Sequence, residues 1–166
     1  MDIIDCLLEE HKELRGSLVL LTLLLDRPSG TGWDDRTALD RRRFTVEMNA
    51  FFAAFKAHEA AEDAYLTRVL RQIGVEPAIS AAIAEGHRAI ADMTRLFAAV
   101  VISCDGEHVH CMRTVLARLR EELESHLAYE EMVVFPELRS RLAKPLLREL
   151  GRRARAQALI RTLVAR

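Results

Sequence analysis

Two histidine–glutamate pairs, each spaced four residues apart, constrain this chain more than any other feature. His58 and Glu62 lie inside the run 44–73, which contains no Gly or Pro and carries apolar residues at helical spacing. Residues four apart lie on one face of a helix, and here that face is the apolar one. His126 and Glu130 repeat the arrangement further along the chain. Because an unpaired charge in a core is costly, such side chains must pair with one another or bind a metal.

Helical periodicity extends over most of the sequence. Half of the 166 residues are hydrophobic but only 5% are aromatic, and there are seven Gly and four Pro, a composition typical of a compact helical protein. Four amphipathic helices are expected, at about residues 2–25, 35–73, 77–103 and 107–141. Asp34 or Asp35 can cap the second helix, and Pro136 is expected to kink the fourth. Short links favour antiparallel neighbours, so we predict an all-α, up-down-up-down four-helix bundle over residues 1–142.

The last part of the chain differs from the rest in charge. From Arg139 onward, nine Lys or Arg residues stand against a single acid, Glu149. We predict a separate basic amphipathic helix over residues 143–166, with a leucine stripe that must be covered. This helix can fold back on the bundle, pair with a second chain or lie on an anionic membrane surface, and we favour a homodimer. A charge run is usually a solvated face and no recognition motif accompanies it, so no nucleic-acid partner is expected.

Composition also indicates the compartment. The chain has no run of about 18 apolar residues, so no membrane span is expected. Its first residues are acidic and enter a helical pattern directly, unlike a secretory signal. Three cysteines, an odd number without a CxxC pair, favour free thiols in a reducing cytoplasm.

Each of the four expected bundle helices carries one histidine on its apolar side. These are His11, His58, His87 and His126. They lie near the middle of their helices or just past it, so an antiparallel bundle brings them to one level. Imidazole and carboxylate ligands in this proportion suit iron, manganese or zinc. Two carboxylates among four histidines suit a pair of metal ions bridged by Glu62 and Glu130, which would offset the repulsion between the ions. A bundle whose histidines only hydrogen-bond the carboxylates, without metal, is the alternative.

These residues and their neighbours resemble a hemerythrin-like, HHE-type cation-binding domain over about residues 2–140. The resemblance is carried by His11, the HEAAE segment at 58–62, the EGHR segment at 85–88 and the segment 126–136, which ends in Phe-Pro. It implies a non-haem di-iron site inside a four-helix bundle, with the two ions joined by an oxo or carboxylate bridge. It also implies chemistry with O2, hydrogen peroxide or nitric oxide.

The sequence departs from the oxygen-carrying hemerythrins at two points. Ala91 stands where they have a second histidine on the third helix, and Glu130 lies four residues after His126 where their acid lies five after. Glu59, about 100° round the helix from His58, is the obvious substitute for the missing ligand. A similar His-Glu-x-x-Glu arrangement occurs in hemerythrin-like domains that sense iron and oxygen. A more anionic ligand set favours ferric iron, so we expect a reaction with O2 or peroxide, for scavenging or sensing, rather than reversible O2 storage.

Two other functions remain open from the sequence, as does catalytic turnover. One is nitric oxide handling or iron donation for the repair of iron centres. The other is an adaptor whose iron state controls an interaction through the basic C-terminal helix. Among nearby residues, Glu10 and Glu131 are expected on the surface, and Val133 on the apolar inner face of the fourth helix.

Overall fold

The computed structural model describes residues 1–26, 38–74, 77–103 and 109–164. The elements are α1 (Ile3–Asp26), α2 (Ala38–Glu62), η1 (Asp63–Thr67), α3 (Arg68–Gln72), α4 (Pro77–Ser103), α5 (Val109–Tyr129), η3 (Glu130–Val134), α6 (Phe135–Arg141) and α7 (Lys144–Val164). No strand occurs within these ranges. The expected cap at Asp34 or Asp35 lies outside the described residues.

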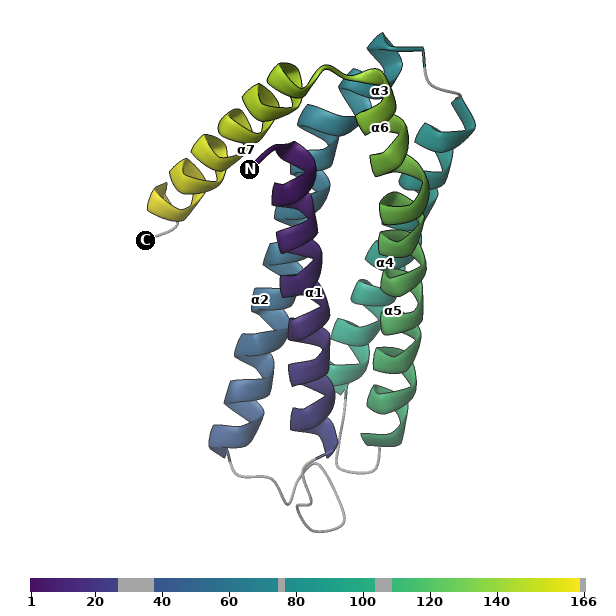
Figure 1. Ribbon diagram of the computed structural model, residues 1–166. Helices are drawn as coiled ribbons and strands as arrows, with labels where there is room; N and C mark the ends of the chain where they lie inside the picture. The colour runs from purple at the N-terminus through teal and green to yellow at the C-terminus, as the bar shows by residue number, and fades with distance from the viewer. Residues whose placement is uncertain (27–37, 75–76, 104–108, 165–166) are drawn as a thin grey trace.

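Four rods run side by side in alternating directions and form the bundle (Figure 1). They are α1, then α2 continued by η1 and α3, then α4, then α5 continued by η3 and α6. The predicted all-α, up-down-up-down bundle with an added C-terminal helix is therefore confirmed. None of the helices described is both long enough and apolar enough to cross a membrane.

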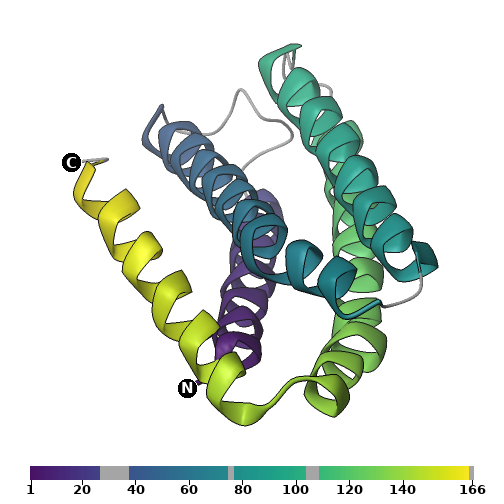
Figure 2. The same ribbon diagram turned by 90° about the horizontal axis from the view of Figure 1, so that it is seen from above.

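The C-terminal helix α7 packs against the start of α1, and the view from above shows it beside α1 and α2 (Figure 2). Leu147 and Leu150 are buried in this contact. A Cβ at Gly151 would lie 2.6 Å from the carbonyl carbon of Asp2, so only glycine permits this close approach. Of the arrangements left open for the tail, the structure has the one in which it folds back. Leu159 and Ile160 stay exposed, so a homodimer through this outer face remains a prediction.

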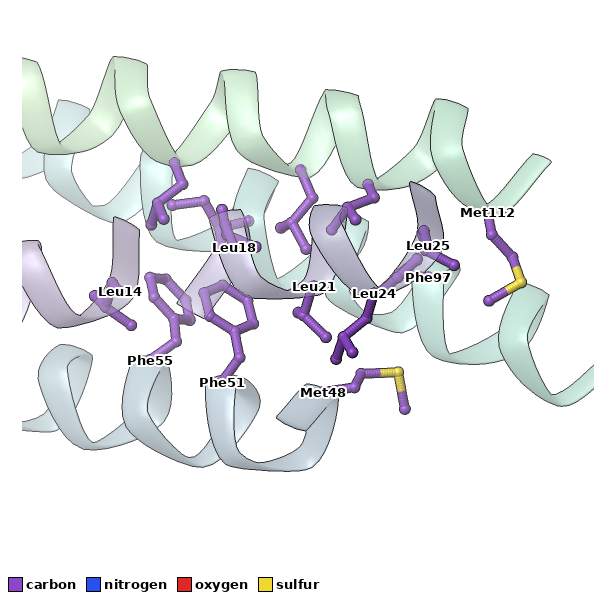
Figure 3. Packing of buried hydrophobic residues seen from close by; sticks show 14 of the residues in the cluster. Leu14, Leu18, Leu21, Leu24, Leu25, Met48, Phe51, Phe55, Phe97 and Met112 are labelled. Atoms are coloured by element: carbon purple, nitrogen blue, oxygen red, sulfur yellow. The ribbon is translucent and has the colours of Figure 1, made fainter. Parts of the chain in front are cut away.

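The apolar core forms two clusters. The lower cluster fills the half of the bundle drawn at the bottom of Figure 1, where leucines of α1 face Phe51 and Phe55 of α2 (Figure 3). Its buried members are Leu14, Leu18, Leu21, Leu24, Leu25, Phe44, Met48, Phe51, Phe55, Ile90, Phe97, Met112, Leu116, Leu119, Leu123 and Leu127. The upper cluster fills the other half of the bundle, and α6 and α7 contribute side chains to it. Its buried members are Ile3, Ile4, Leu7, Leu66, Val69, Leu70, Ile83, Val134, Phe135, Leu138, Leu142, Leu147 and Leu150.

Two π-helical turns, η1 and η3, interrupt rods in which the sequence predicted no break other than the kink at Pro136. In η3 the N–H of Phe135 donates to the carbonyl of Glu130, five residues back. The wider turn adds a residue and rotates the following positions, so Val134 is buried and Val133 is 39% exposed. The expectation that Val133 faces inward was therefore wrong. The break also precedes Pro136, which lies at the start of α6, where its missing N–H costs little.

Candidate metal centre

A layer of polar side chains separates the two apolar clusters. On α1, His11 lies between Leu7 of the upper cluster and Leu14 of the lower cluster. On α4, His87 lies in the same way between Ile83 and Ile90. We call the six residues of this level the polar layer: His11, His58, Glu62, His87, His126 and Glu130. Each of the four rods contributes to it: helical spacing places each side chain on the inner face of its rod, and the antiparallel packing of the rods brings them to one level.

The polar layer divides into two groups that share their carboxylates. One group is His11 and His58 with Glu62 and Glu130, and the other is His87 and His126 with the same two glutamates. Within each group, one ligand-type atom per residue lies within 4.8 Å of the others. The structure therefore gathers six of the seven residues that the sequence suggested as metal ligands.

Glu130 directs one oxygen toward each group. Its Oε2 lies 3.3 Å from Nε2 of His11, and its Oε1 lies 3.2 Å from Nε2 of His126. Glu130 is also the first residue of η3, so the π-helical turn begins at the side chain that joins the two groups.

Glu62 also directs one oxygen toward each histidine pair. Its Oε1 lies 3.4 Å from Nε2 of His58, and its Oε2 lies 2.9 Å from Nε2 of His87. Glu62 immediately precedes η1, so each of the two shared carboxylates lies at the start of a π-helical turn. A carboxylate with one oxygen in each of two donor groups has the arrangement needed to join two cations.

Two carboxylates outside the polar layer hold histidine rings in place. Nδ1 of His11 lies 2.8 Å from Oε1 of Glu131, and Nδ1 of His58 lies 2.9 Å from Oε2 of Glu10. A proton on Nδ1 satisfies each of these contacts and leaves the lone pair of Nε2 directed at the centre, as in metal-bound histidines. Arg15 donates to Glu131 at 2.8 Å and adds positive charge there. The expectation that Glu10 and Glu131 are only surface residues was wrong, because each reaches a histidine on another rod.

Several buried polar atoms of the polar layer have no hydrogen-bond partner among the described residues. They are Nε2 of His11, His58 and His126, Oε1 of Glu62, and both carboxylate oxygens of Glu130. Each such atom costs about 1–3 kcal/mol of desolvation when it stays unsatisfied. Because all of them belong to donors that bind cations, metal ligation accounts for the arrangement. The residues present therefore fit a metal centre.

Burial also shifts the protonation of the polar layer. It raises the pKa of Glu62 to about 8. Burial together with the nearby charge of Glu62 raises the pKa of Glu130 to about 8. Burial and the neighbouring histidines lower the pKa of His126 to about 3, so its ring is neutral at pH 7. A cation between the carboxylates would favour their ionised form and remove the cause of the raised values.

Glu59 lies at the edge of the polar layer and not within it. It is partly buried, and with His87 it lines a cavity of about 330 Å³. Burial raises its pKa, and the charge of His87 acts in the opposite direction. Within the described residues Glu59 contributes no atom to either donor group, so its role as a ligand stays a prediction.

Gly86 shapes the centre, and the sequence analysis assigned it no role. A Cβ at this position would lie 2.4 Å from Nδ1 of His126, so the ring of His126 packs directly against the backbone of α4. Glycine inside a helix costs about 0.5–1 kcal/mol relative to alanine. A helical glycine is not by itself a signal of such an approach, because nothing lies within 4 Å of a Cβ built at Gly16.

Comparison with known protein families gives a match over the second half of the chain. The family model described as Hemerythrin HHE cation binding domain matches residues 78–164. This range runs from α4 to α7 and includes His87, His126 and Glu130, whereas His11 and the pair on α2 precede it. No curated protein and no solved structure matches the chain.

Proposed function

Because the chain belongs to the hemerythrin HHE cation-binding family, we propose that its polar layer holds two iron ions. His11 and His58 would hold one ion, and His87 and His126 the other. The two shared glutamates would join both ions. The observation that carries this proposal is that each shared carboxylate directs one oxygen to each histidine pair.

The donor set favours iron over softer metals. Imidazole nitrogens and carboxylate oxygens suit iron, manganese or zinc, and thiolates are the ligands that select copper(I). Cys6 is buried against Gly151 and Arg155 beneath α7, and Cys111 is exposed near the start of α5. Neither thiol belongs to the polar layer.

We infer that the centre reacts with O2 or hydrogen peroxide, with nitric oxide as the other small molecule that such a site can bind. An iron pair would supply the electrons for such a reaction. The chain contributes an enclosure: the two apolar clusters lie on either side of the polar layer, and five of its six side chains are at most 2% exposed, which leaves no room at the layer itself for a bulky organic substrate. Glu59, in place of the histidine that Ala91 replaces, would add negative charge and stabilise ferric iron. Scavenging or sensing follows more readily from this than reversible O2 storage.

The residues around the centre have separate tasks in this proposal. Glu10 and Glu131 orient His58 and His11, and Arg15 balances the charge of Glu131. Removing such supporting hydrogen bonds typically weakens metal binding by about 10–100-fold. The unpartnered Nε2 atoms then need no further adjustment to act as ligands.

The test is anaerobic reconstitution with ferrous iron, followed by addition of O2 or peroxide to the reduced protein. We expect oxidation that argon does not reverse and that peroxide drives faster than O2 does. Recovery of the reduced spectrum after removal of O2 would indicate an oxygen carrier instead. The Glu59→Ala variant serves as a comparison, and easier return to the reduced state is expected for it.

A second candidate function is an iron-dependent interaction through α7 in the cytoplasm. The observation that favours it is a cavity of about 170 Å³ that is bounded by Glu10 and by Gln157 of α7. Tyr65 of η1 donates to Gln157 at 2.6 Å, so α7 contacts the segment that directly follows Glu62. Hydrogen exchange of α7, compared with and without iron, tests this idea. Equal exchange in both states would rule it out.

A further inference from the structure

A hollow leads from the protein surface toward the polar layer between η1 and α4. Its inner part, which we call the η1–α4 cavity, has a volume of about 330 Å³. It is lined by Glu59, Asp63, Thr67 and Arg71 on one side and by Ser80, Ile83, Ala84, His87 and Arg88 on the other. A neighbouring hollow of about 530 Å³ shares Asp63, Thr67 and Arg71 and extends it outward along η1 and α3.

The inner end of this cavity is His87, a member of the polar layer. The side chain of His87 is 12% exposed, whereas the other five side chains of the layer are at most 2% exposed. Nε2 of His87 lies 2.9 Å from Oε2 of the fully buried Glu62. A single imidazole ring therefore separates the cavity from the shared carboxylates.

The cavity has the size to pass a hydrated cation, and its charged lining consists of two carboxylates, Glu59 and Asp63, and two guanidinium groups, Arg71 and Arg88. Roughly ten water molecules fit in it at the ~30 Å³ that each occupies in the liquid, enough for an ion that keeps part of its water shell. Glu59 and Asp63 are four residues apart, and both line the wall that leads to His87. Carboxylate oxygens are ligands that divalent cations accept readily. The guanidinium of Arg88 donates to the carbonyl of Ala84 and is thereby held to the opposite wall.

We propose that the η1–α4 cavity is the path through which the metal-free protein takes up divalent iron. Asp63 and then Glu59 bind the entering ion in turn, and His87 is the gate at the inner end of the path. The inference rests on the proposed function, because it assumes that the polar layer receives metal. It adds the route by which iron reaches the polar layer and the order in which residues on that route bind it.

Blocking the cavity is the first test. Ala84 is exposed and lines the cavity, so Ala84→Trp should fill it without disturbing the core. Ala81→Trp is the matched control, because Ala81 is exposed on the same helix and does not line the cavity. Metal-free protein is mixed anaerobically with ferrous iron, and the iron that is still unbound at each time is measured with a coloured ferrous chelator in a quenched-flow instrument. We expect Ala84→Trp to slow uptake by about tenfold or more with the same final iron content, and Ala81→Trp to leave the rate unchanged.

A second pair of variants tests the carboxylates without adding bulk. Asp63→Asn should slow iron uptake several-fold and leave the final content unchanged, whereas Glu13→Gln, which removes an exposed charge on α1, should not. Uptake at the wild-type rate in both Ala84→Trp and Asp63→Asn would overturn the proposed path. Failure of the wild-type protein itself to bind iron would instead overturn the proposed function, so the two failures can be told apart.

Discussion

The lower cluster and the polar layer occupy neighbouring turns of the same four rods, yet they differ in what their side chains do for stability. Lower-cluster residues such as Phe51 and Leu119 are fully buried, and each contributes about 1.5–3 kcal/mol by burial. The polar layer instead buries carboxyl groups with raised pKa values and nitrogen atoms without partners. The apolar clusters therefore carry the fold, and the polar layer is a cost that ligand binding offsets.

The two regions also differ in helix geometry. The rods are regular α-helices where they form the lower cluster, and the π-helical turns occur directly after Glu62 and at Glu130. Single π-helical turns inside α-helices are frequent at functional sites. The irregular backbone thus lies beside the shared carboxylates, and the part of the bundle that contains only apolar packing has regular helices.

Removal of a shared carboxylate should give the largest effect on binding. Glu62→Ala takes one oxygen from each donor group, so we expect the protein to lose both iron ions. The metal-free bundle should still fold, because Glu62 contributes cost and not stabilisation there. Metal analysis and circular dichroism measure the two outcomes. An unfolded variant would show that the polar layer supports the fold after all.

The complementary change in the lower cluster should affect stability and spare binding. Phe51→Ala removes a fully buried ring and should lower the free energy of unfolding by about 3–5 kcal/mol. Val46→Ala is the control on the same helix, since Val46 is 57% exposed and should change stability by less than about 0.5 kcal/mol. Denaturant unfolding gives both values, and iron content under folding conditions should stay unchanged. Iron loss in folded Phe51→Ala would break the separation between the two regions.

A smaller and more local effect is expected at Gly86. Gly86→Ala places a Cβ against the ring of His126, so the His87/His126 group should lose its ion while the other group keeps its own. Gly16→Ala is the control, because nothing lies within 4 Å of the added atom there. This control should bind iron normally and gain up to about 1 kcal/mol of stability from helix propensity. Full iron content in Gly86→Ala would mean that His126 is not needed in its present position.

The smallest effect is a pH dependence confined to the metal-free protein. Glu62 and Glu130 have folded pKa values of about 8, above the ordinary value of 4.5, so the folded state holds their protons more tightly than the unfolded chain. Burial of these carboxyls therefore costs least below the unfolded value of 4.5, where both states are protonated, and the folded state loses stability as pH rises from there to about 8. The window from pH 6.5 to 8 avoids His126, whose depressed pKa matters only below its ordinary value of 6.5. Melting temperatures of the metal-free protein should fall across this window, and a rise would contradict the assignment.

Helical periodicity was sufficient to predict the bundle and the six residues of the polar layer. A histidine at helical spacing from apolar neighbours, as at His11 or His87, must face the core whatever the partner helix is. Proline marked the beginnings of α4 at Pro77 and of α7 beside Pro145. These features depend on residues near one another in the chain, which is why the sequence reveals them.

Contacts between distant segments could not be predicted in this way. Glu10 and Glu131 bind histidines that are 48 and 120 residues away in the chain, and both lie at the edge of a helix face where spacing predicts exposure. The π-helical turn at Glu130 buries Val134 in place of Val133. A pattern with a repeat of 3.6 residues contains no signal for the added residue, so this change could not be predicted. The close approach that requires Gly86 depends on the packing distance between two rods, which no local pattern specifies.

The central claim is that the polar layer holds two metal ions joined by Glu62 and Glu130. The most direct measurement is an anaerobic titration of the metal-free protein with ferrous iron, in which unbound iron is measured with a coloured ferrous chelator and stability by melting temperature. Our account predicts a break at two ions per chain and a melting temperature that rises up to that point, because binding to the folded state alone stabilises it. A break at one ion per chain, or no rise in melting temperature, would contradict it.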